Sequence, residues 1–131
     1  MADDLIPEEI GDSETLLRRI HRHFFDPDSG RISSGAFDGL EMSVNWDKYA
    51  NAADTAAQDL TGNILAVVAL SAGKCRNLEQ EVQHDPTSET AEARANQAHS
   101  LVRGKKSRPI KQKLRDASTL VWQAEFGKTI C

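Results

Sequence analysis

ILAVVAL, residues 64–70, is a continuous apolar run that lies between Gly62 and Gly73. A short run of aliphatic residues bounded by glycines is typical of a strand that is covered on both faces of its sheet. We therefore expect this segment to be the central strand of the protein, with the rest of the chain arranged around it.

Four further segments are predicted to form strands or extended structure. TLLRRIHRHFF, residues 15–25, fits a helix by the spacing of its apolar residues and fits a strand by its alternation. The turn cluster DPDSG that follows favours the strand. The other three segments are RISSGAF at 31–37, EVQH at 81–84 and AHSLV at 98–102.

Two longer helices are predicted, one over residues 46–60 and one over residues 108–122. Asn45 is the expected N-cap of the first, and Ser107 is the expected N-cap of the second, with Pro109 in its first turn. A shorter helical turn is expected in SAGKCRNLE, residues 71–79. Together these elements predict the α+β class, with a small mixed sheet and two main helices. The large residues expected in the core or at an interface are Trp46, Trp122, Phe24, Phe25 and Phe37.

The composition favours a single domain over residues 1–131. The chain has 131 residues, of which 39% are hydrophobic, so it can bury a core without disulfides or a structural metal. We expect the acidic segment 1–12 to be loosely ordered. No window is long and apolar enough for a membrane span, and the start of the chain is acidic where a secretory signal would be basic. Together with the absence of paired cysteines, this predicts a cytoplasmic protein with no membrane partner.

Charge is unevenly distributed along the chain, although its net value is only −4. Residues 1–14 carry six acids and no base, and residues 103–115 carry seven bases and no acid. A further block, residues 79–92, holds five acids and no Lys or Arg. The basic segment could therefore meet acids of its own chain, an acidic protein partner or nucleic acid. We expect partner-binding residues at Arg103, Lys105, Lys106, Arg108 and Lys111, and consider nucleic acid the weaker alternative, because no aromatic side chain is near for base stacking.

One group of candidate catalytic residues has the chemistry of a phosphate site. Arg18 and Arg19 can bind phosphate oxygens with their guanidinium groups, and the hydroxyls of Ser33 and Ser34 lie next to Gly35 in the sequence. His21 adds a titratable group. No phosphate-binding glycine loop or nucleophile-elbow motif is present, so arginines that simply flank a strand remain the alternative.

A second group of candidates suits general acid–base chemistry. If the strand that ends at His84 and the strand that begins near His99 are neighbours, then the carboxylate of Asp85 and the two imidazoles of His84 and His99 would meet at one end of the sheet. The alternative is that Asp85 anchors the turn before Pro86. His21 and His23 could begin a metal site, but no metal-binding motif supports one, so we expect no metal and no cofactor.

Several short motifs resemble those of a family of small uncharacterised bacterial proteins. They are LLRRIH, RISSGAF, MSV, HDP and NQAHSLVRGKK, spread from Leu16 to about Lys106. Gln97 departs from the proline of that family's D-P…N-P-A-H element. The resemblance implies a compact bacterial α+β domain. It places Arg18, Ser33, Ser34, Phe37, Ser43, Asp85 and His99 within the motifs without assigning them an activity.

Two functions follow as hypotheses. The first is an accessory protein without catalysis of its own, which acts through a protein partner; it rests on the small size, the lack of a specific catalytic motif and the separated charges. The second is an enzyme or binder that acts on a nucleotide or RNA phosphate. It would use Arg18 or Arg19, His21 and His99, with Ser33 or Ser34 orienting the ligand.

Overall fold

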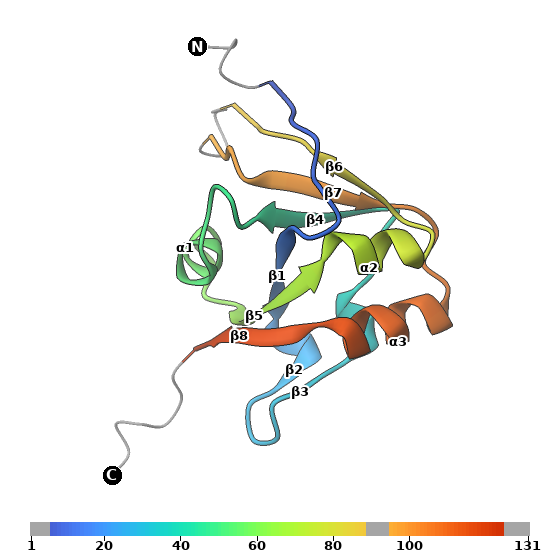
Figure 1. The fold of residues 1–131 in the computed structure, drawn as a ribbon. Coiled ribbons are helices and arrows are strands. Elements are labelled where there is room, and N and C mark those ends of the chain that lie inside the picture. Colours follow the sequence, from blue (N-terminus) through green and yellow to red (C-terminus); the bar gives the residue numbers. More distant parts are fainter. Residues whose placement is uncertain (1–5, 89–94, 125–131) are drawn as a thin grey trace.

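The computed structural model describes residues 6–88 and 95–124, in which a six-stranded sheet carries helices on both faces (Figure 1). Its strands are β1 (Thr15–His21), β4 (Glu41–Trp46), β5 (Ile64–Ser71), β6 (Glu81–His84), β7 (His99–Arg103) and β8 (Thr119–Gln123). They lie in the order β6-β7-β4-β1-β5-β8. The α+β class is confirmed. We expected a mixed sheet, and each ladder between neighbouring strands is antiparallel.

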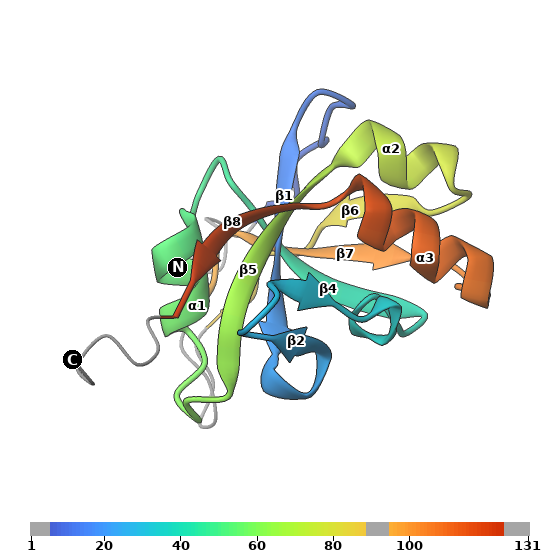
Figure 2. The same ribbon diagram turned by 90° about the horizontal axis from the view of Figure 1, so that it is seen from below.

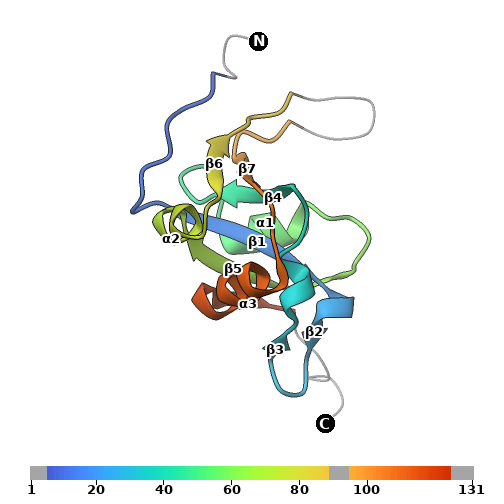
Figure 3. The ribbon, with the colours of Figure 1, turned by 90° about the vertical axis from the view of Figure 1, so that its right-hand side faces the viewer.

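Three helices complete the fold, α1 (Ala52–Ala57), α2 (Ala72–Asn77) and α3 (Arg108–Ala117). Short 3-10 turns cover Arg22–Phe24 and Ser34–Ala36, and a small separate ribbon pairs β2 (Phe25–Asp26) with β3 (Arg31–Ile32). This ribbon projects below the main sheet in Figure 3.

The two faces of the sheet are covered differently (Figure 2). The face with α2 and α3 carries the larger core, which includes Leu16, Val68 and Leu114. The opposite face carries α1, which packs on β1, β5 and β8 and forms a smaller cluster around Val67. Because α1 is short and lies toward one side, Ser43 of β4 and His99 and Leu101 of β7 are partly exposed on this face.

The apolar run at 64–70 forms the predicted strand β5. Val67 and Val68 are both completely buried, one in the smaller and one in the larger cluster, so the strand is covered on both faces as predicted. Its position differs from our expectation, because β1 and β4 occupy the middle of the sheet and β5 lies between β1 and β8.

The helix predicted over 46–60 is wrong at its start and too long. Residues 41–46 form β4 instead, and the helix extends only over Ala52–Ala57, with Asn51 rather than Asn45 as its N-cap. Trp46 ends the strand: its backbone N–H donates to the carbonyl of Ala98, and its indole N–H donates to Glu14 at 2.8 Å. These contacts come from distant segments, and they outweigh the helical spacing of Trp46 with the alanines that follow.

The second predicted helix, 108–122, is also shorter than expected. It begins after Ser107, whose side chain accepts a hydrogen bond from the backbone N–H of Ile110, and it ends at Ala117. Ser118 is extended, and the residues after it form β8, which pairs with β5. The β-branched residues Thr119 and Val121 favour this strand, and Trp122 packs against the smaller cluster.

The strands predicted at 81–84 and 98–102 and the helical turn predicted at 71–79 are confirmed within small shifts of their ends. The strand predicted at 15–25 is right over 15–21, but a 3-10 turn and the ribbon strand β2 replace its second half. The segment predicted at 31–37 is a strand only over 31–32, and the 3-10 turn at 34–36 follows it. Phe25, Phe37 and Trp46 are buried, whereas Phe24 and Trp122 are partly buried against the clusters.

Residues 6–12 form no helix or strand, but they contribute to the core. Ile10 is only 2% exposed, and its carbonyl accepts a hydrogen bond from Arg76 at 2.6 Å. Arg76 also pairs with Asp12 at 2.6 Å. This acidic segment is therefore joined to α2.

No helix in residues 6–88 and 95–124 has the length and apolar character that crossing a membrane requires. Cys75 is buried with a free thiol, and Cys131 lies outside the described residues.

Candidate functional site

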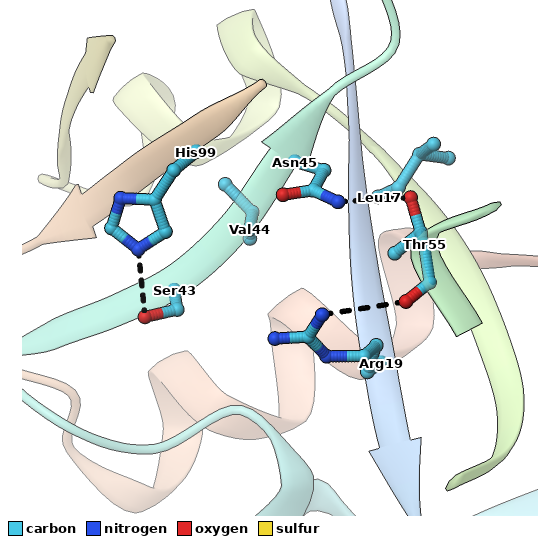
Figure 4. Close-up of a pocket in the computed structure, with 7 residues that line it drawn as sticks. All are labelled: Leu17, Arg19, Ser43, Val44, Asn45, Thr55 and His99. Atoms are coloured by element: carbon cyan, nitrogen blue, oxygen red, sulfur yellow. Dashed lines mark hydrogen bonds between the residues drawn. The ribbon is translucent and has the colours of Figure 1, made fainter. Parts of the chain in front are cut away.

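A small hollow opens beside α1 on the partly exposed half of the sheet (Figure 4). Its volume is about 10 Å³, which is close to the space that one water molecule needs. It is lined by Leu17, Arg19, Ser43, Val44, Asn45, Thr55 and His99.

Strand register explains why these side chains meet. Leu17 of β1 pairs with Asn45 of β4, and Asn45 pairs with His99 of β7. Side chains two residues apart on a strand share a face, so Arg19 and Ser43 lie on the same face as these three. The hollow therefore combines residues of three neighbouring strands with the first turns of α1.

His99 lies between a carboxylate and a hydroxyl. Its Nδ1 is 3.1 Å from Oδ2 of Asp85 and 3.0 Å from the carbonyl oxygen of Asp85, and its Nε2 is 3.4 Å from Oγ of Ser43. Both neighbours of Nδ1 are acceptors, so in the neutral ring Nδ1 carries the hydrogen. The lone pair of Nε2 then faces the hydroxyl of Ser43, which is the arrangement of a general base.

Arg19 brings positive charge to the same hollow. Its Nη1 donates to the carbonyl of Thr55 at 3.3 Å and to Oε1 of Gln58 at 3.0 Å. Its Nε and Nη2 donate to no other group, and no carboxylate lies within 4.0 Å of the guanidinium, among residues 6–88 and 95–124. Burial lowers the pKa of Arg19, and the charge of Asp59 opposes this shift. The group stays protonated at neutral pH, and Nε and Nη2, which have no partner among the described residues, are donors suited to an anion.

A network of amides and a hydroxyl supports the site from the side of α1. Nδ2 of Asn45 donates to Oγ1 of Thr55 at 3.0 Å and to Oε1 of Gln58 at 2.9 Å, while Oδ1 of Asn45 accepts from Nδ2 of Asn96 at 3.0 Å. Asn45 is 3% exposed, so these bonds satisfy a buried amide. They join α1 to β4 and orient Gln58 toward Arg19.

Arg18, Ser33 and Ser34 lie away from the hollow. Arg18 points to the opposite face of β1, where it donates to the carbonyls of Ala36 and Ser43. Ser33 and Ser34 begin the 3-10 turn at 34–36, which packs against α3 on that face. Arg18 lies beside this turn, but its guanidinium donates to the backbone carbonyls of Ala36 and Ser43. The predicted phosphate group is therefore divided, with Arg18 and the serines on one face of the sheet and Arg19 on the other, because neighbouring residues of a strand face opposite ways.

The other histidines serve structural contacts. His21 caps the 3-10 turn by accepting from the backbone N–H of His23 at 3.2 Å, and the two rings stack. His84 lies on the core side against Trp46 and Tyr49. Of the predicted acid–base group, only Asp85 and His99 come together. No group of three or more His, Cys, Asp or Glu side chains suited to a metal occurs in the described part of the chain.

Ser43, Asn45 and Thr55 are the site residues that sequence reasoning did not assign. Ser43 lay within the MSV motif, but no role could be given to it without the pairing of β4 and β7. The sequence predicts Asn45 as a helix N-cap, whereas in the structure it belongs to β4. The sequence does carry one indication of this site. Polar and apolar residues alternate in EMSVN, residues 41–45, which is typical of a strand with one polar face.

The basic segment 103–115 is largely engaged with its own chain. Arg103 pairs with Glu41 at 3.1 Å, and Lys111 pairs with Asp38 at 3.2 Å. Nζ of Lys106 donates to the carbonyls of Gly39, Val102 and Gly104. Lys105 and Arg108 are exposed. The expected intramolecular pairing is therefore present, with acids that lie outside the blocks 1–14 and 79–92.

Comparisons with family models, with curated proteins and with solved structures give no match to this chain. Function is therefore inferred from the geometry of the site.

Proposed function

We propose that the protein binds small phosphate monoesters, such as nucleotides, at the hollow beside α1 and acts on them there. The observation that carries this proposal is that Arg19, whose Nε and Nη2 have no partner among the described residues, lines the same hollow as His99. A cation with unused donors beside a base is suited to a phosphate group that must be held and then attacked.

The size of the hollow limits the ligand. A volume of about 10 Å³ accepts one phosphoryl oxygen rather than a base or sugar, so the rest of the ligand would lie across the mouth. The lining residues of the hollow include one arginine, Arg19, and no lysine. A protein that binds RNA normally makes several cationic contacts along the phosphate backbone. These features favour a small ligand over RNA.

Titration calorimetry with inorganic phosphate, AMP and a short RNA tests the proposal. We expect phosphate and AMP to bind with similar affinity, and Arg19→Gln to weaken both at least tenfold. Arg31→Gln, at an exposed arginine on β3, is the matched control and should change neither. Absence of phosphate binding, or equal binding by Arg19→Gln, would overturn the proposal; preference for the RNA would replace the small ligand with nucleic acid.

The accessory function that acts through a protein partner remains a second proposal, favoured by a different surface. An open groove of about 490 Å³ is lined by Leu40, Glu41, Glu81, Arg103, Gly104 and Lys105. Leu40 is 67% exposed in this groove, next to charges of both signs. The charges of both signs around this groove suit an electrostatically steered encounter with a charged partner.

Association kinetics with the proteins encoded beside this one in the genome test the second proposal. Lys105→Glu should slow association and reduce its salt dependence, because Lys105 lines the groove. Lys113→Glu is the control, at an exposed basic position of α3 outside the lining. Equal association rates for both variants would contradict the use of this groove.

A further inference from the structure

We propose that Ser43 is the nucleophile of this site and forms a phosphoseryl intermediate, with His99 as its base and Asp85 holding the ring of His99. This inference rests on the proposed phosphate function and deepens it. The added claim is that the phosphoryl group bound in the hollow is transferred to a side chain of the protein.

The geometry of His99 singles out Ser43 as the activated hydroxyl. The Nδ1 hydrogen of His99 is held by Asp85, so the lone pair of Nε2 is directed toward Oγ of Ser43 at 3.4 Å. This distance is longer than a tight hydrogen bond, and such contacts in ligand-free sites commonly shorten when substrate binds. The side chain of His99 is 21% exposed, which leaves a route for substrate and water.

Other hydroxyls near the site are committed to different partners. Ser100 is fully buried, and its Oγ donates to the carbonyl of Ala98. Oγ1 of Thr55 accepts from the amide of Asn45 at 3.0 Å, and Thr55 is 1% exposed. Ser43 combines partial exposure, contact with an imidazole nitrogen and a position in the lining of the hollow.

The backbone of Ser43 is also held in place. Its carbonyl accepts a hydrogen bond from Nη1 of Arg18 at 2.8 Å, from the opposite face of the sheet. Within β4, Ser43 is paired with Leu101 of β7, and the ladder with β1 joins the same strand at Asn45 and Trp46. A nucleophile on a central strand is positioned more rigidly than one on a loop.

The reaction proceeds in two displacements. In the first, Oγ of Ser43 attacks the phosphorus atom of the monoester, its proton moves to Nε2 of His99, and the bond between phosphorus and the leaving oxygen breaks. His99 then gives the proton to the departing alcohol. Arg19 binds the phosphoryl oxygens, whose charge must be stabilised during transfer.

In the second displacement, a water molecule attacks the phosphoseryl group. Nε2 of His99 takes the proton of this water, the bond between phosphorus and Oγ breaks, and the proton returns to Oγ of Ser43. The products are the alcohol and inorganic phosphate, and no oxidant or reductant is required.

The test uses 4-nitrophenyl phosphate as the probe, because its leaving group is coloured and needs little protonation. The full chain is mixed with the probe, quenched in acid and digested, and phosphorylated peptides are mapped by tandem mass spectrometry. We expect a phosphoryl group on Ser43 and release of nitrophenolate. Ser43→Ala should remove the adduct while phosphate binding measured by calorimetry is retained.

Matched variants separate a base from a structural histidine. His99→Gln should slow formation of the adduct by about 10²- to 10⁴-fold, which is the usual contribution of a general base. His23→Gln and Ser33→Ala, at residues outside the hollow, should leave the rate unchanged.

The outcomes distinguish this inference from the proposed function. Phosphate binding without an adduct on Ser43, or an adduct at another residue, overturns the nucleophile and leaves the binding site. Absence of phosphate binding overturns both. An adduct that persists in His99→Gln at the original rate contradicts the role of His99. Far-UV circular dichroism and urea unfolding of each variant show that a loss is not caused by unfolding.

Discussion

Arg18 and Arg19 are adjacent in the sequence and have opposite environments in the sheet. The guanidinium of Arg18 is surrounded by backbone carbonyls, whereas that of Arg19 lines the hollow with two of its donor groups free among the described residues. Burial lowers the pKa of Arg18 to about 10. The alternation of side chains along β1 therefore gives one arginine a structural role and the other a position suited to a ligand.

Replacing Arg18 tests this division. Arg18→Met keeps most of the side-chain length but removes the hydrogen bonds to Ala36 and Ser43. We expect the free energy of unfolding to fall by about 1.5–3 kcal/mol, the range for hydrogen bonds made by charged groups. Urea unfolding measures this loss, and calorimetry should find phosphate affinity within twofold of the parent. A tenfold loss of affinity in a folded variant would assign Arg18 to the site.

Cys75 predicts a dependence of stability on alkaline pH. Burial raises the pKa of its thiol from 9.0 to about 11. For an acid whose pKa is raised by folding, the stabilisation is complete below the pKa of the unfolded chain and is lost as the pH rises through the folded value. The parent should therefore lose about 1 kcal/mol more than Cys75→Ala between pH 9 and pH 10.

Urea unfolding of both proteins at these two pH values measures the difference. Because Cys131 and the tyrosine and lysine side chains are common to both, their titration cancels in the comparison. Parallel losses in the parent and in Cys75→Ala would show that the thiol is accessible to solvent or already ionised.

At the scale of elements, α1 shows how a short helix is kept in place. It has six residues, too few to be stable alone, and it depends on its cap and on packing against the sheet. Oδ1 of Asn51 accepts from the backbone N–H of Asp54 at 2.8 Å. The buried bond between Asn45 and Thr55 then ties the helix to β4.

Removing the cap should therefore weaken both the helix and the site. Asn51→Ala is expected to lower the free energy of unfolding by about 1 kcal/mol. Asn51→Ser retains a capping oxygen, so it should lower the free energy of unfolding by only a few tenths of a kcal/mol. Chemical denaturation gives both values. Because Arg19 contacts Thr55 and Gln58, phosphate affinity should fall with the loss of the cap. Equal stability of the two variants would show that packing alone holds α1.

At the scale of the whole molecule, the sheet separates two apolar clusters. The larger contains Trp46, and the smaller has Trp122 packed against it. Strand β5 contributes Val68 to the larger cluster and Val67 to the smaller one. Unfolding of either cluster would therefore expose one face of β5 to solvent. This shared strand predicts that both faces unfold together.

Single-tryptophan variants test this cooperativity. Trp46→Phe reports on Trp122, and Trp122→Phe reports on Trp46. In each variant the urea midpoint from tryptophan fluorescence should equal the midpoint from far-UV circular dichroism. A fluorescence transition of Trp122 that precedes the loss of sheet signal would show that α1 and β8 unfold separately from the rest.

Local composition was enough to predict the elements whose character does not depend on their neighbours. The apolar run at 64–70 favours a strand, because it is short, is bounded by glycines and contains the β-branched residues Ile64, Val67 and Val68. The turn at 26–30 and the cap at Ser107 depend on nearby backbone groups only. The α+β class follows from this kind of information, whereas the meeting of Asp85 with His99 also needed the pairing of β6 with β7.

Tertiary pairing decided the rest. Residues 41–46 and 119–123 became strands because β1, β7 and β5 supply their hydrogen bonds, and those partners lie far away in the sequence. The same pairing set the register that brings Arg19, Ser43 and His99 to one hollow and sends Arg18 to the opposite face. A shift of one residue in register would reverse the face of every side chain, and only the packing of the whole sheet selects the observed one.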